Sequence, residues 1–145
     1  MSTISKIASD KALVSLITGR ISVPLSESES RVVPVYRQGG RPNTESPEEF
    51  IEVYNNGIIQ AVTRPLGVYR GNIAITVYCQ AFPDETIKFN RVESLLGQIE
   101  DLVHCKTGDN IYFEVDSANL ITPTTYDAES GYSITIINVE WHTTV

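Results

Sequence analysis

The sequence predicts an α+β domain: a mixed, mainly antiparallel sheet with two amphipathic helices packed on one face, and a long loop or hairpin arm. Two observations lead to this class. Apolar residues recur at helical spacing near the start and in the middle of the chain, and other segments alternate apolar and polar residues as strands do. Hairpin-linked strands around two such helices are typical of α+β domains. With 145 residues, the chain is expected to form one domain, residues 1–145.

The first thirty-six residues predict a helix followed by an edge strand. Apolar residues recur near helical spacing at Ile4, Ile7, Leu13, Leu16 and Ile17, and Gly19 suits the left-handed conformation that often ends a helix. Pro24 prevents the helix from resuming, and the polar residues 26–30 are expected to form a loop. Residues 31–36 are rich in β-branched side chains but contain Pro34, which predicts an edge strand or a strand end.

The middle of the chain predicts a long loop and an arm. Residues 37–49 are rich in glycine, proline and charge, and loops of this length are usually functional or disordered. Residues 50–57 predict a short strand that ends in a turn at Asn56-Gly57. Residues 58–70 have no clean period, so we expect an extended arm or the distal part of a long hairpin.

The second half predicts strand, helix and two further strands. Residues 71–82 alternate most clearly, and residues 83–86 are expected to open a helix with Asp84 as its cap. Within that helix, one apolar stripe consists of Phe89, Val92, Leu95, Leu96, Ile99, Leu102 and Val103. Residues 111–121 are predicted to be a strand, and residues 131–145 its antiparallel partner.

The final strand has apolar residues on different faces in its two halves. One face carries Tyr132, Ile134 and Ile136, and the other carries Ile137, Val139, Trp141, Thr143 and Val145. Two explanations stay open. A bulge near Ile136-Ile137 would rotate the faces without any partner. Alternatively, a neighbouring subunit covers part of the strand, which predicts an obligate oligomer.

Charge is unevenly distributed along the chain, whose net charge is −7. Residues 1–83 carry eight Lys or Arg and seven Asp or Glu, whereas residues 84–145 carry three and eleven. Two acid-free segments, between Glu29 and Glu45 and between Glu52 and Asp84, contain Arg31, Arg37, Arg41, Arg64 and Arg70. The asymmetry indicates either a solvated surface or contact between basic and acidic parts of two copies. An acidic chain without a dense basic stripe argues against a nucleic-acid-binding function.

Composition and the N-terminal sequence indicate the compartment. The chain has no apolar run near the roughly 20 residues that a membrane helix needs, and its start does not resemble a signal peptide. Two cysteines, Cys79 and Cys105, are too few for a disulfide scaffold, and we expect both to be structural and buried. We therefore expect a soluble protein that folds in a reducing cytoplasm.

No catalytic, cofactor or metal motif is present. The cysteines and the two histidines lack zinc-ligand spacing. The acid pairs Glu48-Glu49, Asp84-Glu85 and Glu100-Asp101 are adjacent in sequence, whereas paired-carboxylate catalysis needs groups that face each other across a cleft. We find neither a nucleophile elbow nor a phosphate-binding glycine loop. The sequence therefore predicts no enzyme, no cofactor and no metal.

The order of elements and several strand sequences resemble those of a known family. The leading helix is followed by RVVPVYRQGGRPNTESPEEFIEVYNNG, then YRGNIAITVYCQAF, an amphipathic helix and a final hairpin that closes in SITIINVEWHTTV. This arrangement, over nearly the whole chain, resembles the tail terminator proteins, also called tail completion or neck proteins, of long-tailed bacteriophages. The resemblance implies a mixed sheet flanked by helices. It also implies a hexameric ring that caps the tail tube and joins it to head-completion proteins.

The resemblance also implies a place and partners. The protein would be a virion component of the tail or neck, made in the host cytoplasm. Its partners would be sister subunits, the tail tube protein and head-completion or connector proteins, with no membrane. The expected contact elements are the loop Arg37–Glu49 and the arm Ile58–Gly71. The expected contact residues are Arg31, Arg37, Arg41, Glu48, Glu49, Arg64, Arg70 and Trp141.

A closed ring needs two different, complementary patches on each subunit, which basic and acidic segments could supply. An acidic channel would let DNA pass without binding. The candidate channel-lining acids are Glu100, Asp101, Asp109, Glu114 and Asp116. Two alternatives stay open: another head–tail connector of similar size, or a small monomeric or dimeric module that binds a ligand or peptide through residues 37–71.

Overall fold

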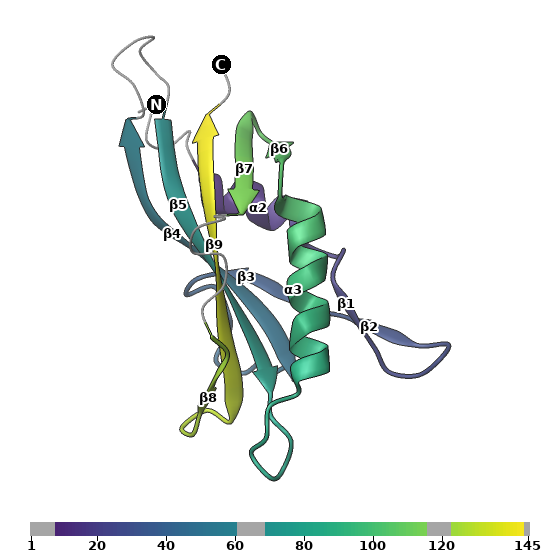
Figure 1. Ribbon diagram of the computed structural model, residues 1–145. Helices are drawn as coiled ribbons and strands as arrows, with labels where there is room; N and C mark the ends of the chain where they lie inside the picture. The colour runs from purple at the N-terminus through teal and green to yellow at the C-terminus, as the bar shows by residue number, and fades with distance from the viewer. Residues whose placement is uncertain (1–7, 61–68, 116–122, 144–145) are drawn as a thin grey trace.

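The protein is an α+β domain, as predicted. The computed structural model describes residues 8–60, 69–115 and 123–143 (Figure 1). In this part of the chain, two helices, α2 (Ser9–Ile17) and α3 (Phe89–Val103), accompany a seven-stranded sheet and a separate two-stranded hairpin. The helices pack on one face of the sheet and share its core, which is the layer arrangement that the sequence predicts.

The sheet is mixed but mainly antiparallel. Its strand order is β3-β4-β5-β9-β7-β6, and β8 pairs with β9 next to this path. Only the pairing of β3 with β4 is parallel among the described strands, and β3 lies at the edge, as the run around Pro34 predicts. The strands are β3 (Val35–Arg37), β4 (Glu49–Gln60), β5 (Tyr69–Gln80), β6 (Lys106–Gly108), β7 (Ile111–Val115), β8 (Thr125–Asp127) and β9 (Tyr132–Thr143).

Helix α2 agrees with its prediction where the structure describes it. It buries Ala12, Leu13 and Ile17 against the sheet, and Gly19 follows its end with a φ of +77°, the conformation that glycine adopts most readily. The predicted turn that holds Ile4 and Ile7 lies outside the described residues.

Helix α3 begins later than predicted. Residues 83–86 do not open the helix, because the Asp84 carboxylate accepts hydrogen bonds from the backbone N–H and hydroxyl of Thr86, at 3.2 and 2.6 Å. The Phe82 N–H also donates to the Thr86 carbonyl, at 3.0 Å, which closes a turn. Asp84 therefore stabilises a loop and does not cap α3, which starts at Phe89.

The Asn56-Gly57 turn prediction is wrong. Strand β4 continues through it to Gln60, and the register with β5 shifts between Asn55 and Gly57, so the dipeptide forms a bulge. The long partner β5 pairs on both sides of the bulge, and the ladder resumes with Gly57 opposite Asn72. The hairpin prediction for residues 58–70 is confirmed at its described ends, while residues 61–68 lie outside the described part.

Strand β9 has no bulge, so the first explanation of its apolar pattern is wrong. Its register with β5 runs unbroken from Gln80 opposite Tyr132 to Arg70 opposite His142. The odd-numbered residues from Ser133 to Trp141 are buried, but the first two are Ser133 and Thr135. These polar side chains are satisfied by the Cys79 carbonyl at 3.1 Å and the Thr124 hydroxyl at 2.7 Å. The buried face therefore changes from polar to apolar without changing side.

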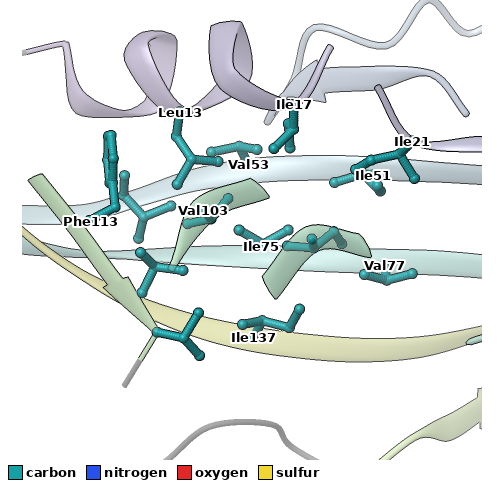
Figure 2. Packing of buried hydrophobic residues seen from close by; sticks show 14 of the residues in the cluster. Leu13, Ile17, Ile21, Ile51, Val53, Ile75, Val77, Val103, Phe113 and Ile137 are labelled. Atoms are coloured by element: carbon teal, nitrogen blue, oxygen red, sulfur yellow. The ribbon is translucent and has the colours of Figure 1, made fainter. Parts of the chain in front are cut away.

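The apolar half of β9 is covered by its own chain, which also contradicts the second explanation for these residues. Ile137, Val139 and Trp141 are each 2 % exposed or less. They belong to the core that α2, α3, β4, β5 and β7 share, in which Leu13, Ile75, Val103 and Phe113 converge (Figure 2). The predicted strand 111–121 contributes to this core as β7, and its residues 116–121 lie outside the described part.

The opposite face of the sheet is covered in part by the loop 37–49. Phe50 and Tyr78 stack with ring centroids 4.4 Å apart, and Tyr132 meets Phe50 edge-on at 5.3 Å. The Arg41 guanidinium lies 4.7 Å from the Phe50 centroid, and the Tyr132 hydroxyl donates to the Pro47 carbonyl at 2.6 Å. The loop is therefore a structural cover over an aromatic cluster.

A feature that the sequence analysis missed is a hairpin outside the main sheet. Strands β1 (Ser22–Pro24) and β2 (Ser30–Val32) pair antiparallel and project past α3, away from the sheet (Figure 1). We call residues 22–32 the β1–β2 arm. Apolar Ile21 and Val23 alternate with polar residues before the polar stretch 26–30, and this pattern could have predicted a hairpin.

Trp141 provides a test of this core. Replacing Trp141 with Ala should lower the free energy of unfolding by about 3–5 kcal/mol, because the ring is buried and the change leaves a large cavity. Chemical denaturation measures the loss. Tyr54→Ala, at a side chain 47 % exposed, is the control and should change stability by about 0.5 kcal/mol or less. Equal effects of the two changes would contradict the assignment of Trp141 to the core.

Candidate functional site

An apolar groove lies between the β1–β2 arm and the start of α3. Its volume is about 570 Å³. Three elements line it: the arm, the β5–α3 loop and the first turns of α3. The lining residues are Val23, Pro24, Phe82, Ile87, Lys88, Phe89, Asn90, Arg91 and Ser94, and we call this site the arm groove.

Exposed apolar side chains concentrate around the arm groove. Among the described residues, five large apolar side chains are exposed, and four of them belong to its walls or to the arm. Phe82 and Phe89 are 49 % and 56 % exposed, and Leu25 and Val32 are 51 % and 54 % exposed. Because soluble monomers rarely gather such side chains in one place, this surface suits contact with another molecule.

Phe89 is exposed although its spacing continues the apolar stripe of α3. The side chains that this helix buries are Val92, Leu95, Ile99 and Val103, so the buried stripe begins one turn after Phe89. The prediction that Phe89 packs in the core is therefore wrong. Its ring lies in a wall of the arm groove instead.

Among the described residues that line the arm groove, two are cationic and none is acidic. The Lys88 ammonium lies 5.2 Å from the Phe82 ring centroid, a cation–π contact. Lys88 forms no ion pair with a carboxylate in the described part of the chain. Arg91 is 26 % exposed and uses one guanidinium nitrogen within the protein.

The walls of the arm groove are held in place by a buried carboxylate. Glu49, at the start of β4, is 1 % exposed and accepts hydrogen bonds from Arg91 at 2.8 Å and from Arg31. We call these three residues the Glu49 clamp. Arg31 belongs to the arm and Arg91 to α3, so one carboxylate joins both walls to the sheet. The hydrogen bond with Glu49, against the opposing effect of burial, raises the pKa of Arg31 above its ordinary value.

A second tie fixes the arm to α3. The Gln98 side chain accepts a hydrogen bond from the Ser22 N–H at 3.0 Å and donates to the Ser22 carbonyl at 2.9 Å. A planar amide that bonds both backbone groups of one residue imitates a neighbouring strand. A short isolated hairpin is only marginally stable in water, so these side-chain ties explain why the arm is ordered.

The predicted contact residues divide into buried and exposed groups. The structure brings Arg31, Glu48 and Glu49 together, with Arg31 also 3.2 Å from Glu48. Glu49 and Trp141 are buried by their own chain, so these two side chains offer almost no surface for contact with another subunit. Arg31 is engaged in the clamp and Glu48 remains exposed at its edge.

The remaining predicted arginines do not form one patch. Arg37 pairs with Asp10 at 2.9 Å, and this pair lines a second, more polar hollow of about 480 Å³. Arg41 covers the aromatic cluster and lies 3.9 Å from Glu52. Arg70 is exposed on β5, and Arg64 lies outside the described residues. Arg37, Arg41 and Arg70 do not line the arm groove.

The predicted channel acids are not on one surface. Glu100 and Asp101 are exposed on α3, which covers the core face of the sheet. Glu114 alternates with the buried residues Phe113 and Val115, so it points to the opposite face of the sheet. Asp109 lies in the β6–β7 turn, and Asp116 lies outside the described residues.

The cysteines and histidines give no metal site within residues 8–60, 69–115 and 123–143, where no three potential ligands come together. The structural prediction holds for Cys79, which is buried, but Cys105 is exposed, so the prediction that both are buried is wrong. The residue lies at φ +59° in the connection from α3 to β6, where the backbone turns its side chain outward. His104 accepts a hydrogen bond from the Val115 N–H at 3.1 Å.

Comparison of the sequence with protein-family models and with curated proteins gives no match. Where the structure describes the chain, no helix is both long and apolar enough to cross a membrane.

The Glu49 clamp predicts a specific loss of stability. Replacing Arg91 with Met should lower the free energy of unfolding by about 1.5–3 kcal/mol, because Glu49 loses one of two charged hydrogen bonds. Replacing both Arg31 and Arg91 with Met should cost more than the two single changes together, because the buried carboxylate then has no cation. Denaturant titration measures these values, with Arg20→Met as an exposed control. Additive losses would show that the clamp does not act as a unit.

The two thiols should differ in reactivity. Burial, the largest cause, raises the pKa of Cys79 to about 11. One thiol per native chain, that of Cys105, should therefore react with an aromatic disulfide reagent near pH 8, and two should react after denaturation. Because the folded state keeps the Cys79 proton longer than the unfolded state, its contribution to stability is lost as pH rises from about 9 through 11. Two fast-reacting native thiols would contradict this assignment.

Proposed function

We propose that this chain is a structural subunit, not an enzyme, that forms a ring on the tail tube of a tailed bacteriophage. In this proposal the ring is built of six copies, caps the tube and joins it to the head-completion proteins. The assignment to a tail rests on the resemblance of element order and strand sequences. The proposal that this chain contacts its partners through one particular surface rests on the arm groove.

The observation that carries the contact role is the cluster of exposed apolar side chains around the arm groove. Leu25, Val32, Phe82 and Phe89 are each about half exposed, and they lie on the arm, the β5–α3 loop and the start of α3. Burying apolar surface stabilises association by about 25 cal/mol per Å², so this region is the part of the described surface that would gain most from a partner. Aromatic side chains at such positions are common centres of binding energy.

The fold supports this proposal without deciding it, because one fold can serve many functions. The sheet and helices form a body from which an arm projects, and the ties through Glu49 and Gln98 hold that arm. A ring requires head-to-tail contacts between two different patches on each subunit. A fixed arm and a separate body surface meet that requirement.

Charge supports the passage of DNA through the proposed ring. The chain is acidic, and Glu100 and Asp101 are exposed together on α3. If this surface faces the channel, it repels phosphate and leaves the passing DNA unbound. Because Glu114 lies on the opposite face of the sheet, the proposed channel lining is reduced to the acids on the α3 side.

A second candidate function is a small monomeric or dimeric module that binds a ligand or peptide. The volume of the arm groove, about 570 Å³, lies within the range of small-molecule sites. This candidate places the ligand in the arm groove and not in residues 37–71, whose loop covers the aromatic cluster. It predicts a small species at every protein concentration.

Solution mass separates these functions. The ring proposal predicts a species six times the 16.1 kDa chain, either at high concentration or after mixing with assembled tail tubes. Sedimentation velocity and electron microscopy measure mass and symmetry. Phe89→Ser should weaken association by about 2 kcal/mol, roughly thirtyfold, because a central aromatic contact is lost.

Tyr54→Ser is the matched control, since Tyr54 is similarly exposed but lies outside the arm groove. It should leave the association constant unchanged. A chain that stays monomeric at every concentration and also fails to bind tubes would refute the ring.

A further inference from the structure

We propose that the arm groove of one copy binds the tip of the β1–β2 arm, residues 25–29, of a second copy. This inference rests on the proposed function for the closure of such contacts into a ring. The contact itself is argued from the shape, charge and exposure of the two surfaces.

The arm tip is a preformed turn with an apolar side chain and two carboxylates. The Leu25 and Ser26 N–H groups donate to the Glu29 carbonyl at 2.9 and 3.2 Å, and the Ser26 hydroxyl accepts from the Glu29 N–H at 3.1 Å. Leu25 is 51 % exposed, and Glu27 and Glu29 are exposed beside it. No described cation forms an ion pair with either carboxylate. Such a turn binds with little loss of conformational freedom.

The tip cannot enter the arm groove of its own chain. Pro24 lines that groove and pairs with Ser30, and beyond this pair the arm projects past α3 (Figure 1). The base of the arm is fixed by Gln98 at Ser22 and by the Glu49 clamp at Arg31. Folding the tip back into this groove would break these contacts. A leucine flanked by glutamates that occupies the groove must therefore come from another molecule.

The arm groove is complementary to the tip in both polarity and charge. Phe82 and Phe89 offer apolar walls for a leucine, and Lys88 and Arg91 offer cations for the two glutamates. The acids Asp84 and Glu85 of the same loop are not among the lining residues. Opposite charges at the edge of an apolar contact align the partners and select the register.

The arm is suited to docking through side chains and not through strand addition. Pro24 has no N–H group, so β1 cannot extend a ladder at that position. Proline at an edge strand also prevents uncontrolled pairing with another chain. Because each copy presents one tip and one groove, the contact is head-to-tail and can repeat around a closed ring.

Disulfide trapping tests this contact even when association is weak. One chain carries Leu25→Cys and the other Phe89→Cys, and both carry Cys105→Ser to remove the exposed native thiol. Cys79 is buried and does not need replacement. Mixed under mild oxidation, the two chains should form a cross-linked heterodimer at least tenfold faster than Leu25→Cys mixed with the exposed α2 control Ser15→Cys. Equal rates would overturn the proposal.

Charge reversal provides a second measurement. Lys88→Glu alone, or Glu27→Lys with Glu29→Lys, should slow cross-linking between L25C and F89C chains by tenfold or more. Combining the reversals in matched chains, so that a lysine-bearing tip meets a glutamate-bearing groove, should restore the rate to within about threefold of the original. Failure of this rescue, with all chains folded by circular dichroism, would count against the proposed charge pairing.

The outcome is separable from that of the proposed function. Six-fold rings on tail tubes without the L25C–F89C cross-link would refute the arm contact and leave the ring function standing. Rapid cross-linking without any ring on the tube would support the arm contact and refute the ring function.

Discussion

A single buried carboxylate organises the surface of this protein. Glu49 begins the long strand β4, and two guanidinium groups reach it from elements that are otherwise far apart in sequence. A carboxylate removed from water is strongly unfavourable without such partners, so the arm and the start of α3 must both come to this point. The arm groove is the space left between the two elements that Glu49 holds. The shape of this apolar groove therefore depends on a charged interaction, the hydrogen bonds of Arg31 and Arg91 to Glu49.

The two faces of the sheet are covered in different ways. Helices α2 and α3 bury the apolar face, where the side chains of β5 and β9 alternate inward in unbroken register. On the other face, an irregular loop covers part of a cluster of stacked or edge-on aromatic rings, those of Tyr36, Phe50, Tyr78 and Tyr132. In a sheet with helices on one face, the other face is expected to be polar and exposed to water. Here a loop and aromatic side chains cover part of that other face. Of the five large apolar side chains exposed in the described part of the chain, four lie on the arm, the β5–α3 loop and the start of α3.

Local sequence patterns predicted the main helices and strands, but they did not predict which distant side chains contact one another. The alternation around Ile73 and Ile75 and the three-to-four spacing from Val92 to Val103 place β5 and α3 correctly, because local burial alone decides both. The pattern of β9 misled because a buried strand face can be polar when its hydroxyl groups find partners, as Ser133 and Thr135 do. The arm groove could not be predicted, since Arg31 and Arg91 reach Glu49 across 18 and 42 residues of sequence. Contacts between residues so far apart in the chain produce no periodic pattern in the sequence.

The polar start of the buried face of β9 gives the domain two unequal ends. Near Trp141 and Phe113 the ladder between β5 and β9 lies over large apolar groups, whereas near Ser133 it lies over buried hydroxyl groups. The Ser133 end instead carries the rings of Phe50, Tyr78 and Tyr132 on the opposite face of the sheet, so opening either end exposes apolar area. Backbone amides at both ends of this ladder should therefore exchange with solvent through openings that uncover packed side chains, and not through fraying of one end.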